Sequence, residues 1–233
     1  MPHQDIIDYL QSLACPEIAE HSLRFFKTAE GEYGACDKFL GIRVPLIRRA
    51  VTKYKSASLS TAEDLLSSEF HEIRLFALLL LVSQYSRNKP NEQAKIYNLY
   101  LQNTRYINNW DLVDSSAPKI VGAYLQDKNR GVLYALAASD LLWERRIAIM
   151  ATFHFIRLNQ FDDALQLSEQ LLNDPEDLIH KAVGWMLREV GKRDLDSELS
   201  FLDRHYTKMP RTMLRYAIEK FDQTTRQHYL NSE

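Results

Sequence analysis

Residues 177–193 read DLIHKAVGWMLREVGKR, a stretch in which apolar side chains recur every three or four positions. This spacing is typical of an amphipathic α-helix with one apolar stripe toward a core. The stripe consists of Ala182, Val183, Met186, Leu187 and Val190. A second face carries Lys181, Trp185, Arg188 and Lys192. A tryptophan within a row of cations is not a core pattern, so the second face is a candidate binding surface.

Three other stretches share one feature of this helix, a basic residue followed closely by alanine: IRLFAL (73–78), WERRIAI (143–149) and MLRYAI (213–218). The markers Arg74, Arg146, Lys181 and Arg215 are separated by 72, 35 and 34 residues, so the first gap spans two periods. Helix pairs with a period in the mid-thirties predict an all-α fold, an α-solenoid of HEAT-like helical repeats. We expect one domain over residues 1–233, curved, with the markers on a basic concave face.

The composition fits a folded helical protein that functions inside the cell. Of the 233 residues 45% are hydrophobic, and seven glycines and seven prolines leave few helix breakers. Two cysteines, Cys15 and Cys36, form no C-x-x-C pair, so neither a disulfide framework nor a thiol-ligated metal site is indicated. The longest apolar run, residues 75–82, is too short to span a membrane. We therefore expect a cytoplasmic location and no membrane partner.

Charge is spread unevenly along the chain. The formal net charge is −2, yet residues 38–62 hold six basic residues and no acid. A helix that begins near Pro45 would direct Arg48 and Arg49 outward, close to Arg43. This run is either a solvated helix face or part of a polyanion site. The candidate cations, which would suit a phosphate backbone or an acidic partner, are Arg43, Arg48, Arg49, Arg146, Lys181, Arg188 and Arg215. We expect acidic side chains to lie elsewhere.

The repeat without a basic marker reads NNWDLVDSSAP (108–118) and places Trp110 and Asp114 where other repeats carry a cation. On a helix the two share a face, and a carboxylate beside an aromatic ring stabilises developing positive charge or orients water. Alternatively, Asp114 caps a following helix, and Trp110 and Trp185 pack as core between repeats. The histidines lack the spacing of a catalytic metal site, and no cofactor fingerprint occurs.

Five motifs together resemble the AlkD-type DNA alkylation repair proteins, a family of HEAT-like-repeat DNA glycosylases. They are FLGIRVP (39–45), NNWDLVDSSAP (108–118), WERRIAI (143–149), DLIHKAVGWMLREVGKR (177–193) and MPRTMLRYAIEK (209–220). The resemblance implies hydrolysis of the N-glycosidic bond of cationic alkylpurines, N3-alkyladenine and N7-alkylguanine, in double-stranded DNA, without a tight base-flipping pocket. An aspartate and two tryptophans of the family match Asp114, Trp110 and Trp185, and a DNA-contacting arginine matches Arg146.

Three positions depart from the family pattern: Asn109 replaces an aromatic residue, Arg43 a glutamine, and Phe25 a tyrosine. These differences concern how the protein binds DNA and which lesions it prefers. We expect a monomeric glycosylase without metal or cofactor. The alternative is a non-catalytic HEAT-repeat protein that binds DNA structures or an acidic protein partner. The Trp110–Asp114 pair favours the enzyme, because a scaffold has no evident need for it.

Overall fold

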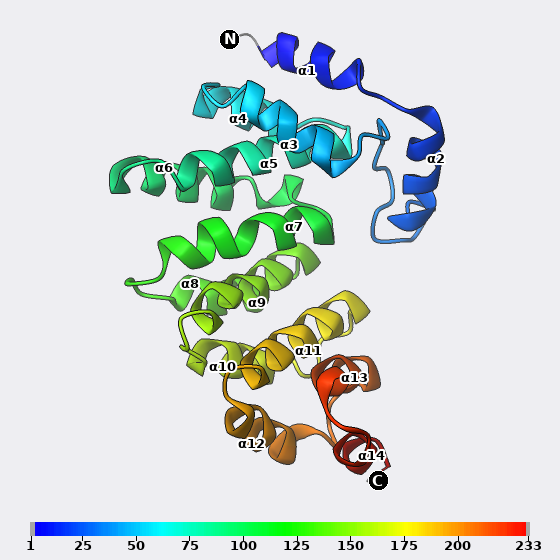
Figure 1. Ribbon diagram of the computed structural model, residues 1–233, viewed down its shortest axis with the longest axis vertical. Coiled ribbons are helices and arrows are strands. Elements are labelled where there is room, and N and C mark those ends of the chain that lie inside the picture. The colour runs from blue at the N-terminus through cyan, green and yellow to red at the C-terminus, as the bar shows by residue number, and fades with distance from the viewer. Residues whose placement is uncertain (1–2, 232–233) are drawn as a thin grey trace. The chain divides into compact units, whose positions relative to one another are not determined.

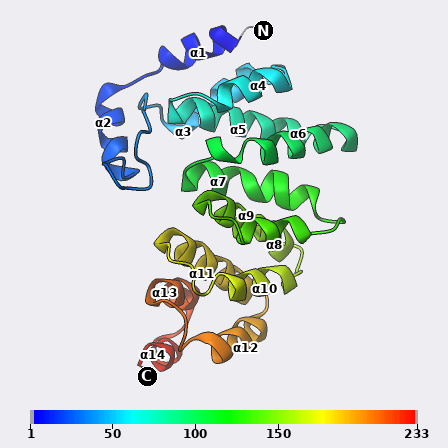
Figure 2. The same ribbon diagram turned by 180° about the vertical axis from the view of Figure 1, so that it is seen from behind.

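The computed structural model describes residues 3–231, and within this range the chain is all-helical (Figures 1 and 2). The described helices are α1 (His3–Gln11), α2 (Pro16–Phe25), α3 (Val44–Lys53), α4 (Leu59–Leu66), α5 (His71–Tyr85), α6 (Pro90–Gln102), α7 (Trp110–Ala117), α8 (Gly131–Ala137), α9 (Leu142–Ile156), α10 (Asp162–Gln170), α11 (Asp177–Gly191), α12 (Leu195–His205), α13 (Arg211–Ala217) and α14 (Gln223–Asn231). Short 3-10 segments lie at Thr104–Tyr106 and Ile218–Lys220, and a π-helical segment at Pro118–Gly122. The all-α prediction is confirmed.

The chain divides into two compact units, one up to Ile120 and one from Val121 onward. In the first unit α5 packs against α3, α4, α6 and α7, and its residues from Ile73 to Leu81 are buried. In the second unit α9 packs against α8, α10 and α11, and α11 also packs against α12 and α13. Each unit thus has its own buried central helices. The expectation of a single domain, curved with a basic concave face, stays a prediction.

The repeat is confirmed in its register along the chain. Arg74 is the fourth residue of α5, and the other three markers are each the fifth residue of their helix, in α9, α11 and α13. Asp114 is the fifth residue of α7. A carboxylate therefore takes the helix position that carries a cation in the other repeats.

Prolines lie at helix starts, as the sequence predicts, because the first helical turn needs no backbone N–H donor. Pro90 is the first residue of α6 and Pro45 the second residue of α3. After α7, which ends at Ala117, the chain stays helical but continues as a π-helical segment. The reason is Pro118, which cannot donate the α-helical hydrogen bond to the carbonyl of Asp114 and so forces the register to change.

Gly184 marks a close approach of α13 to the backbone of α11. A Cβ atom at this position would collide with the carbonyl oxygen of Met213 and lie 2.6 Å from the Cβ of Tyr216, both on α13. The glycine therefore lets the backbones of α11 and α13 pack against each other, next to Trp185 in the sequence of α11.

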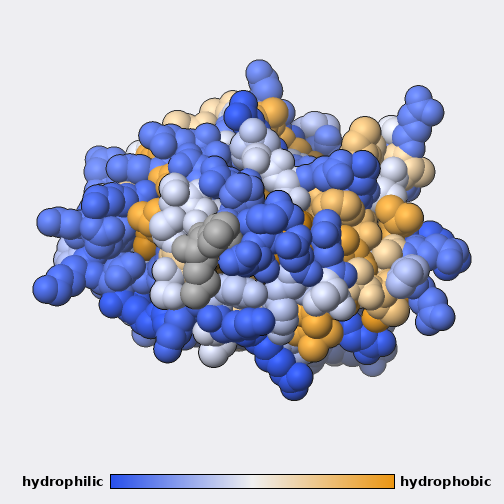
Figure 3. Space-filling model, turned by 90° about the horizontal axis from the view of Figure 1, so that it is seen from above, coloured by the Kyte–Doolittle hydropathy of each residue, from blue (hydrophilic) through white to orange (hydrophobic). Residues whose placement is uncertain are grey.

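The surface seen in Figure 3 is mainly hydrophilic, with hydrophobic side chains gathered in smaller patches. This distribution is what amphipathic helices leave after their apolar stripes are buried. Among residues 3–231, no helix combines the length and the apolar character needed to cross a bilayer.

Candidate functional site

Helix α7 carries Trp110, its first residue, and Asp114 on one helix face. Asn109 caps the helix, since its side-chain Oδ1 accepts a hydrogen bond of 2.8 Å from the backbone N–H of Trp110. Trp110 and Asp114 are both half-buried and lie one turn apart. The interpretation of Asp114 as the cap of a following helix is wrong, because Asp114 lies inside α7. Asn109, where the family pattern has an aromatic residue, thus has a local role. Its side chain caps the N-terminus of the helix that carries Trp110 and Asp114.

Two phenylalanine rings pack against the Trp110 ring. Phe26 stacks on it at 5.6 Å between ring centroids, and Phe25 meets it edge-on at 5.9 Å. Phe26 in turn lies 4.8 Å from the His71 ring and stacks on Phe39 at 5.1 Å. Phe25 itself is 56% exposed. Trp110 is therefore the half-buried edge of an aromatic cluster, with Phe25 extending that surface toward solvent.

A buried histidine joins α5 to the start of α7. His71, which is 2% exposed, donates a hydrogen bond of 2.9 Å from Nε2 to Asp111 and faces Asp37 with Nδ1 at 3.4 Å. Burial opposes the charged form of His71, but the hydrogen bonds to Asp111 and Asp37 outweigh it and raise its pKa to about 9. The imidazolium therefore fixes Asp111, the residue next to Trp110.

Asp37 links this histidine to a buried arginine. Burial opposes ionisation of Asp37, yet its hydrogen bond with His71 and the charge of Arg74 lower its pKa. Arg74 donates to Asp37 at 2.7 Å and is only 3% exposed, and Asn108 donates to the same carboxylate at 3.2 Å. The marker Arg74 is thus a structural cation inside the first unit.

Three predicted phosphate ligands of the first unit are displayed at the surface. Arg43 immediately precedes α3, and Arg48 and Arg49 project from it, all three exposed. In the described part of the chain none of the three takes part in an ion pair with an acidic side chain. The basic run of residues 38–62 therefore leaves unneutralised positive charge on this helix.

Trp185 of the second unit is anchored by a buried carboxylate. Its indole Nε1 donates to Glu189 at 3.2 Å, one turn further along α11, and its ring lies 6.1 Å from that of Phe153. Glu189 also accepts from Lys192 at 2.5 Å. Although burial opposes it, the bonds from Lys192 and Trp185 lower the pKa of Glu189. Trp185 is half-buried, as Trp110 is, so neither lies in the fully buried core.

The cations predicted to bind DNA in the second unit differ in exposure. Arg215 is exposed, and Lys181 pairs with Asp177 at 2.6 Å. Arg188 pairs with Glu219. Arg146 is 5% exposed and donates to the carbonyl of Leu178 at 2.5 Å.

Two expectations about these cations are therefore corrected. The four markers do not share one exposed surface, because Arg74 and Arg146 are buried. Acidic residues do not lie elsewhere, because Asp177 and Glu219 pair with Lys181 and Arg188. DNA contact by Arg146 stays a prediction.

The predicted site residues fall into two groups. Trp110, Asp114, Arg43 and the two arginines of α3 belong to the first unit, whereas Trp185 and the remaining candidate cations belong to the second. The structure places Trp110 beside Asp114 on α7, and Trp185 between Lys181 and Arg188 on α11. A single site that combines Asp114 with Trp185 stays a prediction.

Sequence reasoning missed the residues that support the two tryptophans, namely Asp37, His71, Asp111 and Glu189. One signal was available for His71, since charged or polar residues at 71, 72 and 74 interrupt an otherwise apolar helix. Such residues inside a buried helix need partners. Over the described residues 3–231, no group of three His, Cys, Asp or Glu side chains is arranged to hold a metal ion.

Comparison with known proteins adds three findings. A family model described as DNA alkylation repair enzyme matches residues 6–221. Among solved structures, the fold is similar to that of a predicted DNA alkylation repair enzyme from Enterococcus faecalis, with a TM-score of 0.70 and 17% sequence identity. That match covers 90% of this chain and 97% of the other. No curated protein matches the chain.

Proposed function

The chain belongs to the DNA alkylation repair enzyme family, and from this membership we propose that it is a DNA glycosylase acting on positively charged alkylpurines in duplex DNA. The lesions would be N3-alkyladenine and N7-alkylguanine, hydrolysed without a tight base-flipping pocket. The proposal includes the monomeric state and the cytoplasmic location expected from the sequence.

The chemistry asks little of the protein beyond electrostatics and water. Alkylation leaves the base cationic, so the bond between C1′ and the base nitrogen breaks with its electron pair passing to the base, which departs neutral. Positive charge then develops on the sugar, and water adds to C1′ and loses a proton. We assign stabilisation of the oxocarbenium-like sugar and placement of the water to the Asp114 carboxylate. Trp110 offers its π face to the same developing charge.

The observation that carries the proposal is the position of Asp114 in the repeat. The fifth residue of the repeat helix is a cation in α9, α11 and α13, whereas in α7 it is a carboxylate one turn from Trp110. A surface that only neutralises phosphates would gain nothing from a carboxylate at that place. An enzyme that stabilises a cationic transition state would gain from a carboxylate at this position, because the negative charge offsets the developing positive charge.

Substrate binding is proposed for the exposed cations and the second tryptophan. Backbone phosphates would be neutralised by Arg43, Arg48, Arg49 and Arg215. The guanidinium group of arginine suits this role because it can donate two hydrogen bonds to one phosphate. Lys181 and Arg188 would exchange their carboxylate partners for phosphates. Trp185, held by Glu189, would contact the sugar of the lesion, and Arg146 would reach DNA only after leaving the Leu178 carbonyl.

The test is release of bases from methylated duplex DNA by the wild type and by Asp114→Asn. We expect wild type to release N7-methylguanine and N3-methyladenine, and Asp114→Asn to do so on the order of 100-fold more slowly, as for loss of one electrostatic stabiliser. Asp64→Asn, an exposed aspartate on α4, is the matched control and should retain full activity. Chromatography of the released bases measures the rates.

Two outcomes would contradict the proposal at different points. Equal rates for wild type and Asp114→Asn would remove Asp114 from the chemistry. Salt-sensitive DNA binding by wild type with no base released would favour the non-catalytic HEAT-repeat alternative.

A further inference from the structure

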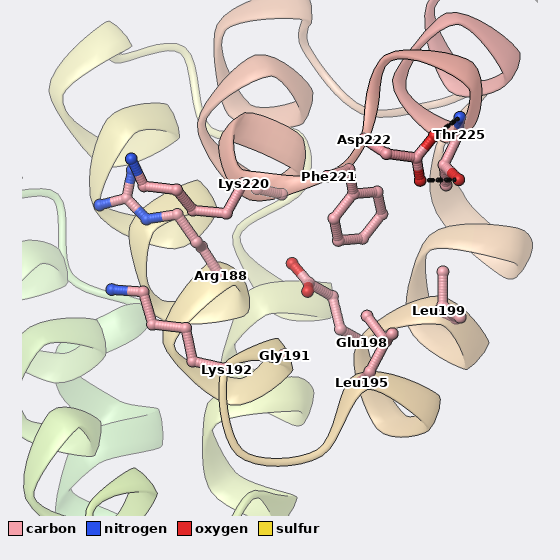
Figure 4. A pocket seen from close by; sticks show the side chains of 11 residues that line it. Arg188, Gly191, Lys192, Leu195, Glu198, Leu199, Lys220, Phe221, Asp222 and Thr225 are labelled. Carbon is pink, nitrogen blue, oxygen red and sulfur yellow. Dashed lines mark hydrogen bonds between the residues drawn. The ribbon is translucent and has the colours of Figure 1, made fainter.

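The second unit contains a cavity of about 370 Å³ between the C-terminal part of α11, α12 and the start of α14 (Figure 4). Its volume lies in the range of small-molecule sites in proteins. Leu195 and Phe221 provide apolar walls, and Figure 4 shows the carboxyl group of Glu198 turned toward the side of the cavity that carries Arg188 and Gly191. None of Leu195, Glu198 and Phe221 has a part in the proposed base release.

Two residues that line this cavity each contain a buried polar atom without a hydrogen-bond partner. Oε1 of Glu198 makes no hydrogen bond, although the residue is 2% exposed. Nε of Arg188 likewise makes none, since Arg188 pairs with Glu219 through a terminal nitrogen. An unpaired buried polar atom costs about 1–3 kcal/mol, so two in one cavity indicate a missing hydrogen-bonding partner.

Gly191 makes room for the carboxyl group. A Cβ at this position would collide with Oε2 of Glu198. The carboxyl group therefore lies against the backbone of α11 at Gly191.

At neutral pH both unpaired groups are donors. Burial raises the pKa of Glu198 to about 8, and the opposing effect of Arg188 is smaller. The carboxyl group is then a neutral acid with an O–H to donate. The charged or titratable groups around it are Arg188 and Lys192 of α11, Lys220 after α13, and Asp222 and Tyr229 at α14.

The missing partner should therefore be an acceptor. Lys192 and Lys220 line the same cavity, and Figure 4 places both on the side of Arg188. We propose that this cavity binds a small organic oxyanion, a carboxylate or a phosphate monoester, with an aromatic or aliphatic body. Its oxygens accept hydrogen bonds from Glu198 and Arg188, and its body packs against Phe221 and Leu195.

Calorimetric titration with benzoate and phenyl phosphate tests the ligand class, with phenol as the probe that lacks the oxyanion. We expect at least one of the two oxyanions to bind at pH 7, at least tenfold more tightly than phenol. Binding of benzoate alone identifies a carboxylate site, and binding of phenyl phosphate alone a phosphate site. No binding of either, or equal binding of phenol, overturns the proposal.

Two substitutions of Glu198 separate its donor role from a role in folding. Glu198→Leu removes the donor and should weaken binding at least tenfold. Glu198→Gln keeps an N–H donor that does not titrate, so it should bind within twofold of wild type at pH 7. At pH 9.5 the wild type should bind at least tenfold more weakly than at pH 7, whereas Glu198→Gln should be unaffected.

The control is Glu176→Gln, an exposed change in the same unit, which should bind as wild type does. Equal weakening by both Glu198 variants, or parallel pH profiles of wild type and Glu198→Gln, would overturn the donor role. Glu198→Leu should bind unmodified duplex DNA within twofold of wild type. A parallel loss of DNA binding would assign the cavity to backbone phosphates and overturn the small-molecule proposal.

Discussion

Replacing His71 with glutamine should change how the free energy of unfolding depends on pH. In the folded protein the imidazolium lies between Asp37 and Asp111, and its pKa is raised from 6.5 to about 9. Because a tenfold change in proton affinity is worth about 1.4 kcal/mol, this difference corresponds to about 3 kcal/mol. His71 is almost fully buried, so solvent does not screen the interaction.

The sign follows from the raised pKa. Below pH 6.5 His71 is protonated in both folded and unfolded protein, and the full contribution is present. Between pH 6.5 and about 9 only the folded protein holds the proton, so stability is lost as the pH rises. The wild type should therefore lose about 3 kcal/mol more than His71→Gln across this window.

Urea unfolding at pH 6, 7, 8, 9 and 9.5 measures the difference between the two proteins. Glu198 also titrates in this range, but it is present in both proteins and cancels from the difference. His21→Gln, at an exposed position on α2, is the control and should run parallel to wild type. A constant difference between wild type and His71→Gln from pH 6 to 9.5 would refute the charged bridge between α5 and α7.

Further predictions concern packing and DNA binding. Gly184→Ala should lower the free energy of unfolding by about 1–3 kcal/mol in a denaturant titration, because the new methyl group meets the backbone of Met213. The control is Gly131→Ala, whose Cβ would meet the side-chain oxygen of Asn129 at 2.9 Å and which should lower it by less than about 0.5 kcal/mol. Arg48→Ala and Arg49→Ala should each reduce the slope of log affinity against log salt by about 0.9 for unmodified duplex DNA. An unchanged slope in the double variant would exclude α3 from the interface.

Much of the fold could be predicted from the sequence because it depends on local patterns. Apolar spacing of three and four residues, prolines at helix starts and a basic marker that recurs with a period in the mid-thirties can all be read along the chain. The same register predicted that Trp110 and Asp114 occupy the place of a cation. Glycine is costly inside a helix, and at Gly184 the compensating contact is the close approach of α13.

The exposure of the charged residues was decided only by tertiary structure. Arg74 and Arg215 carry the same repeat signal, yet Arg74 is buried against Asp37 and Arg215 is exposed. A helical pattern specifies which face a side chain occupies, but not what packs against that face.

The hydrogen-bond network of Asp37, His71 and Asp111 next to Trp110 could not be predicted from the sequence, because it too depends on which helices pack together. Asp37, His71 and Asp111 are 34 and 40 residues apart along the chain and meet only after α5 and α7 have packed. The sequence by itself determined the helices, their repeat and the Trp110–Asp114 pair, since these depend on spacing along the chain. Tertiary structure decided which charges are buried, paired or open to a ligand, because the free energy of a charge depends on the groups brought around it.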